Sequence, residues 1–120
     1  MAKPTAIGFG AVFDLATVDR ELRSEAAYQR DGHTARTLVR EPAIRVVLVA
    51  IRAGAKIAEH RTGDTASIHA LTGHIRLRLP DHAVDLPAGQ LLVIAPRVTH
   101  DVEAVSDSAF LITLARGEHE

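Results

Sequence analysis

Apolar residues near the start of the chain recur at intervals of three and four, which is the spacing of one face of an α-helix. This stripe comprises Leu15, Val18, Leu22 and Ala26. We predict one short helix over residues 17–30, with Thr17 as its N-cap and Asp31-Gly32 as its stop. Residues 1–13 before the helix are expected to form an extended arm.

From His33 onward the pattern changes to short apolar runs separated by Gly and Pro turns, which is typical of β-strands. Residues 43–52 and 91–95 are apolar at both odd and even positions, which predicts strands covered on both faces. The alternating runs at 74–79, 84–86, 98–104 and 110–114 predict strands with one buried face. Short strands at this spacing indicate an all-β sandwich or barrel.

A chain of 120 residues has the length of one domain. We expect three parts: residues 1–32 as an arm and helix packed on the barrel, residues 33–116 as the barrel, and residues 117–120 as a tail. The N-terminus lacks the apolar segment of a signal peptide, and the longest apolar runs are too short to span a bilayer. We therefore expect a cytoplasmic protein with no membrane partner.

Composition narrows the chemistry that is available. The formal net charge is −1 and charges of one sign form no run, so the electrostatic pattern of a nucleic-acid-binding protein is missing. The chain contains no Cys, which excludes disulfides, thiolate metal sites and a cysteine nucleophile. The seven His residues are the main metal ligands and acid–base groups that remain.

Two stretches of the chain resemble the two sequence motifs of the cupin superfamily. In GAKIAEHRTGDTASIHALTG, Gly54 is followed after five residues by His60, and Gly73 stands at the end of the motif. In GQLLVIAPRVTH, Gly89 and His100 have the separation of the second motif. The resemblance covers residues 43–115, and the chain looks like small single-domain bacterial cupins without an assigned reaction.

The resemblance implies an all-β double-stranded β-helix, the cupin jelly-roll barrel, which is open at one end. Metal-dependent cupins place four ligands in that mouth, and the matching positions here are His60, Thr62, Ala66 and His100. Thr62 is a poor metal ligand and Ala66 is none, so we expect no tightly bound metal. A divalent transition metal held weakly by His60 and His100 stays an alternative.

Three further residues are candidates for the missing third ligand. Glu59 is expected on the opposite face of its strand from His60, because side chains alternate along a strand. Asp64 is expected in a turn, from which it could bend back toward the mouth, and His69 is expected outside the barrel.

The predicted ligand pocket consists of His60, Thr62, Ala66, Ile68, Arg97 and His100. Arg97 replaces the Gly of the second cupin motif. It is either a residue at the lip of the pocket that pairs with an acidic ligand or an Arg in a solvated turn. Arg76 and Arg78 are expected on a solvated or interface face, and His33 and His82 in surface turns.

The resemblance and the incomplete ligand set favour a small-molecule-binding barrel with a pocket around His60 and His100. The alternative is a divergent metal-dependent cupin enzyme, of the dioxygenase, isomerase or lyase type, that uses the same two residues. A third interpretation is a purely structural dimer. We also expect a homodimer, formed through residues 46–51 or through the arm around Phe9 and Phe13.

Overall fold

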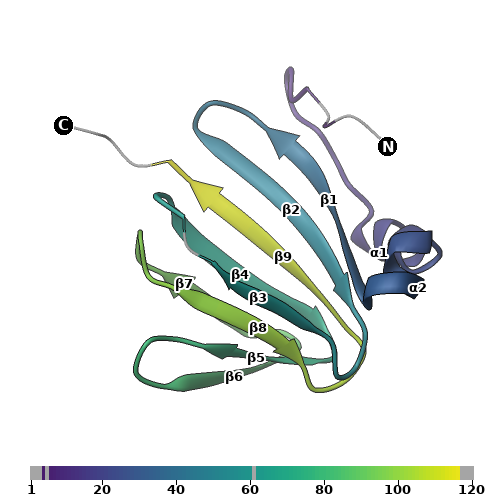
Figure 1. Ribbon diagram of the computed structural model, residues 1–120. Coiled ribbons are helices and arrows are strands. Elements are labelled where there is room, and N and C mark those ends of the chain that lie inside the picture. Colours follow the sequence, from purple (N-terminus) through teal and green to yellow (C-terminus); the bar gives the residue numbers. More distant parts are fainter. Residues whose placement is uncertain (1–3, 5, 61, 117–120) are drawn as a thin grey trace.

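The protein folds into two antiparallel β-sheets that face each other, with two short helices beside the first strand (Figure 1). The computed structural model describes residues 4, 6–60 and 62–116, except for the side chains of Glu59 and His60. The five-stranded sheet has the order β1-β2-β9-β4-β7, and the four-stranded sheet has the order β3-β8-β5-β6. The elements are α1 (Leu15–Arg23), α2 (Ala26–Asp31), β1 (His33–Arg40), β2 (Ile44–Ile51), β3 (Lys56–His60), β4 (Thr65–Thr72), β5 (His74–Arg78), β6 (Ala83–Pro87), β7 (Leu91–Ile94), β8 (His100–Ala104) and β9 (Ser108–Ala115).

This architecture confirms the predicted all-β fold with a helical N-terminal segment, but that segment contains two helices instead of one. Asp14, and not Thr17, is the N-cap of α1, since its carboxylate accepts a hydrogen bond from the Thr17 N–H at 3.2 Å. Ser24 ends α1 because its hydroxyl donates to the Glu21 carbonyl at 2.7 Å and competes with the helical backbone. Gly32 ends α2 in the left-handed conformation, with φ 81°, as predicted.

The break between the helices changes which residues face the core. Leu22 is fully buried and Leu15 and Val18 pack beside it, but Ala26 is exposed. Tyr28 of α2 is buried in its place. The predicted apolar stripe is therefore correct as far as Leu22 and wrong at Ala26.

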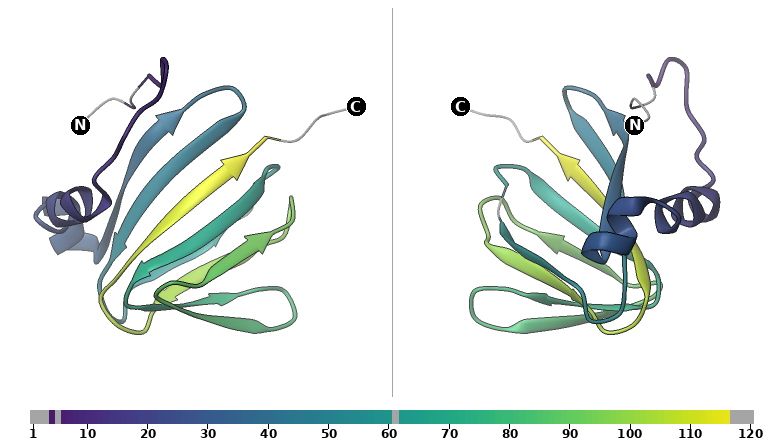
Figure 2. Two further views of the ribbon diagram at one scale, coloured as in Figure 1. Left: turned by 180° about the vertical axis from the view of Figure 1, so that it is seen from behind. Right: turned by 45° about the vertical axis from the view of Figure 1, so that its right-hand side comes forward.

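The hydrophobic pattern did not predict three of the strands, β1, β3 and β4, and β7 differs from its prediction. β7 lies at the edge of the five-stranded sheet, and the side chains of Leu91 and Val93 on its outer face are each 58% exposed. The expectation that this strand is covered on both faces was wrong, because the helices cover the opposite end of the sheet at β1 and β2 (Figure 2).

The buried residues form two cores, one on each face of the five-stranded sheet. The inner core lies between the sheets, around Phe110, Ile68 and Ile75. The outer core lies between β2 and the N-terminal arm and helices, where Leu48 and Ala50 meet Leu22. Strand β2 is thus covered on both faces, as predicted.

The outer core covers one of the two surfaces predicted to form a dimer. β2 is flanked by β1 and β9, and its outer face packs against residues that include Phe13, so residues 46–51 are already covered within one chain. The homodimer itself stays a prediction. Within the described residues, the helices are all too short and polar to cross a membrane.

Candidate functional site

Two connected pockets occupy the space between the sheets. The larger has a volume of about 300 Å³ and the smaller about 90 Å³. The larger is lined by His33, Ala35, Val47, Val49, Ile57, Ile68, His100, Val102, Phe110 and Ile112. The smaller is lined by Val47, Thr62, Ala66, Ile68, His100, Ile112 and Leu114. The shared residues show that the two pockets are neighbouring parts of one apolar interior.

Among the residues whose side chains the structure describes, His100 is the one polar residue that lines both interior pockets. It begins β8, shares its inward face with Val102 and Ala104, and is only 4% exposed. Its ring Nδ1 lies 3.1 Å from the Val98 carbonyl, and Nδ1–H is the donor because a carbonyl oxygen can only accept. This bond fixes the orientation of the ring on the pocket wall.

His60 is the backbone partner of His100 across the β3–β8 pair. Its strand position is therefore described, whereas its side chain lies outside the described residues. The sequence-based expectation that both residues serve one pocket rests, for His60, on this register alone.

The structure brings Thr62, Ala66 and Ile68 together with His100 on the wall of the smaller pocket. Ala66 and Ile68 are buried on the inner face of β4, while the intervening Ser67 belongs to the other face. The Thr62 hydroxyl accepts a hydrogen bond from the Asp64 N–H at 3.2 Å.

Arg97 lies apart from these residues. Its side chain is exposed in the turn before β8 and lines neither interior pocket. Its φ is 67°, in the left-handed region that favours Gly, and its N–H donates to the Thr62 carbonyl at 2.7 Å. The turn therefore has the backbone conformation of a glycine although the chain has Arg there.

Arg97→Gly is expected to raise the free energy of unfolding by about 0.5–1 kcal/mol, because it removes the left-handed strain at the cost of some chain entropy. Urea denaturation measures the change. Arg97→Ala, which keeps the strain, is the control and should show no gain. Equal stability of the Gly and Ala variants would contradict this explanation.

His33 is the residue that sequence reasoning misplaced. A surface turn is predicted for it, but it begins β1, is half-buried and lines the larger pocket with His100. Its backbone partner Ile51 is fully buried in the inner core. The signal that would have found it is the register of β1 on β2, which the polar sequence of β1 hides.

The other described His residues lie outside the barrel. His69 is on the outer face of β4, His82 is exposed beside Asp81, and His74 is on the outer face of the four-stranded sheet. On that face Arg76 donates to Asp85 at 2.9 Å, and His74 lies 3.2 Å from the same carboxylate. These contacts, Arg76 first, lower the pKa of Asp85.

The outer face of the four-stranded sheet carries charges of both signs. Arg78 lies 3.6 Å from both Asp101 and Glu103. Because these charges compensate one another on an exposed face, they belong to a solvated surface and not to an anion site.

The described donors do not fit a catalytic transition-metal site, which usually has three protein ligands and an open position. Within residues 4–116, apart from those whose side chains are not described, no three His, Asp or Glu side chains come together. Ala66 has no donor atom. The other described residues that line the two pockets are apolar except for Thr62, His33 and His100.

Comparison with known proteins agrees with this architecture. No family model and no curated protein matches the chain. A conserved protein of unknown function from Streptococcus pyogenes has a TM-score of 0.75 at 22% identity, over 99% of this chain and 98% of that one. A cupin-2 domain containing protein from Shewanella frigidimarina has a TM-score of 0.69 at 17% identity, over 88% of this chain and 95% of that one.

A larger enzyme contains the same fold. Salicylate 1,2-dioxygenase from Pseudoaminobacter salicylatoxidans, in its adduct with gentisate, has a TM-score of 0.80 at 16% identity, over 94% of this chain but only 35% of the dioxygenase. At these identities the likeness concerns the fold alone. The chain has the cupin fold.

Proposed function

We propose that this cupin barrel binds a small, largely apolar molecule between its sheets and holds no tightly bound metal. The observation that carries the proposal is the interior pocket of about 300 Å³, walled almost entirely by aliphatic side chains and Phe110. This volume lies at the lower end of the range for ligand sites, which are typically apolar with a few placed polar groups.

His100 is the central polar group of the proposed site. Its buried ring is oriented by the bond from Nδ1 to the Val98 carbonyl, and it faces both interior pockets. In this proposal His100 and His33 give the ligand its orientation, and the resemblance to the cupin motif adds His60 as a further polar group. The aliphatic walls supply the affinity through burial of apolar surface.

A neutral fluorescent probe, N-phenyl-1-naphthylamine, tests whether the interior takes up a ligand. We expect saturable fluorescence enhancement with one site per chain. Val47→Phe should abolish it, because Val47 lines both interior pockets and a larger ring would fill them. Val93→Phe is the matched control, since Val93 is exposed on the outer face. Equal binding to both variants would overturn the proposal.

Elemental analysis of protein purified without a nickel column tests the second half of the proposal. We expect well below one equivalent of any transition metal per chain, because position 66 has no donor atom and Thr62 is a poor ligand. One equivalent of metal that His100→Ala removes would contradict this expectation. That result would favour the alternative of a divergent metal-dependent cupin enzyme.

A further inference from the structure

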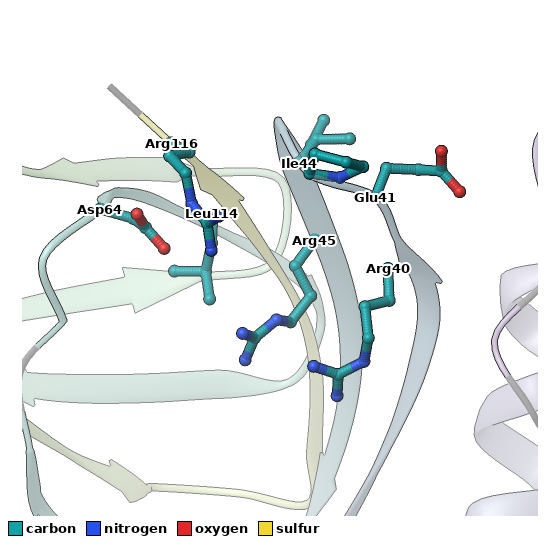
Figure 3. Close-up of a pocket in the computed structure, with 8 residues that line it drawn as sticks. Arg40, Glu41, Ile44, Arg45, Asp64, Leu114 and Arg116 are labelled. Carbon is teal, nitrogen blue, oxygen red and sulfur yellow. The ribbon is translucent and has the colours of Figure 1, made fainter. Parts of the chain in front are cut away.

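A third pocket, of about 310 Å³, lies at the open end of the barrel and is rich in Arg (Figure 3). The ends of β1, β2 and β9 and the turn between β3 and β4 form it. Its charged residues are Arg40, Arg45, Arg116, Asp64 and Glu41. We call it the mouth pocket.

Arg40 and Arg45 are direct partners across the β1–β2 pair. Arg45 has the same strand parity as Val47 and Val49, which line the interior pocket, so both Arg residues belong to the concave face of the sheet. Figure 3 shows their guanidinium groups extending to the same side, next to each other, while the Glu41 carboxylate points away. Two like charges directly opposite each other destabilise a strand pair unless an opposite charge compensates them.

Within the part of the chain that the structure describes, Arg40, Arg45 and Arg116 form no ion pair with a carboxylate. Asp64 and Glu41 also line the pocket and can offset at most two of these three positive charges, so a positive excess remains. Among the other described Arg residues, Arg20, Arg52 and Arg97 likewise form no ion pair with a carboxylate, whereas five do. Those with acidic partners are Arg23, Arg30, Arg36, Arg76 and Arg78.

The mouth pocket adjoins the apolar interior. Leu114 lines both the mouth pocket and the smaller interior pocket, and Ile112 continues the wall into the larger one. From the Arg residues inward, the lining therefore changes from charged to aliphatic side chains, and His100 lies on the wall of the interior pockets.

From this gradient we propose that the ligand is an amphipathic carboxylate. Its anionic head pairs with Arg40 and Arg45 in the mouth pocket, and its apolar body occupies the interior. A planar guanidinium presents parallel N–H donors that match a carboxylate, and charge-assisted hydrogen bonds of this kind are the stronger ones in proteins. The inference rests on the proposed function and adds the chemical class of the ligand.

Calorimetric titration with octanoate and with octan-1-ol separates the contribution of the anionic head group to the binding affinity from that of the apolar body. We expect wild-type protein to bind octanoate about tenfold or more tightly than octan-1-ol. Arg45→Gln and Arg40→Gln should each weaken octanoate binding about tenfold and leave octan-1-ol unchanged. Arg30→Gln, which removes an exposed Arg paired with Asp31, is the control of equal charge change and should alter neither.

Other outcomes overturn the inference in distinguishable ways. Equal affinity for the two probes, with N-phenyl-1-naphthylamine still bound, would reject the carboxylate while leaving the proposed function in place. Inorganic phosphate that binds as tightly as octanoate would make the mouth pocket a simple anion site, against the amphipathic ligand. No binding of octanoate, octan-1-ol or N-phenyl-1-naphthylamine to the wild-type protein would reject the proposed function as well.

Discussion

Gly73→Ala is expected to lower the free energy of unfolding by about 3 kcal/mol or more. Gly73 has φ +76°, and a Cβ built on it would lie 2.3 Å from both the Asp107 carbonyl oxygen and the Ser108 hydroxyl. Neither atom can withdraw easily. Ser108 is fully buried, and its hydroxyl accepts from the His74 N–H at 2.9 Å and donates to the Ser106 carbonyl at 2.7 Å.

Two other glycines separate the clash from the backbone strain. Gly89 has φ +91° but no atom within 4 Å of its added Cβ, so Gly89→Ala should cost only about 1–2 kcal/mol. Gly63 has open space and no left-handed φ, so Gly63→Ala should leave stability nearly unchanged. Guanidinium denaturation orders the three variants. A Gly73→Ala protein no less stable than Gly89→Ala would contradict the role of the contact with Asp107 and Ser108.

The sequence identified Gly73 only as the last residue of a motif, and the structure supplies the physical reason. The same contrast holds for the strands. Alternation predicted β5, β8 and β9 because each has one apolar inner face. It missed β1, whose outward Arg36 pairs with Glu21 at 2.6 Å and Glu25 at 3.2 Å in the helical segment. These ion pairs join the polar outer face of β1 to residues distant in the sequence, and a local hydrophobic pattern cannot predict such contacts.

The site residues also could be predicted from the sequence only in part. Motif spacing placed His100, Ala66 and Ile68 on the inner wall, but it said nothing of His33 and Arg40. These two residues are seven positions apart, so a regular strand would put them on opposite faces. The register of β1 shifts between Thr37 and Val39, so His33 pairs with Ile51 and Arg40 with Arg45, which have the same parity. A β-bulge thus puts both side chains on the concave face, and a single sequence does not reveal such a shift.

The double variant Thr62→His, Ala66→Glu is expected to create a divalent-metal site. Both positions line the smaller interior pocket beside His100, so an imidazole and a carboxylate would join the imidazole already there. Without metal the variant should be less stable than wild type by about 1–3 kcal/mol, because Ala66 is 2% exposed and a Glu there is desolvated. Free Zn²⁺ at 100 times its dissociation constant should raise the free energy of unfolding of the variant by about 2.7 kcal/mol.

Thermal unfolding with and without Zn²⁺ or Ni²⁺ measures this gain, and wild-type protein should show little or none. Thr62→His, Ser67→Glu is the matched control, since it adds the same groups but places the carboxylate on the outer face of β4. A metal-dependent shift in the first variant alone would establish that positions 62 and 66 have the geometry of ligands and that their present residues are what keeps a metal from binding tightly. Equal behaviour of the two variants would show that the correspondence with the cupin motif is wrong at these positions. The poor donor at position 62 and the missing donor at position 66 would then no longer support the proposal that the barrel holds no tightly bound metal.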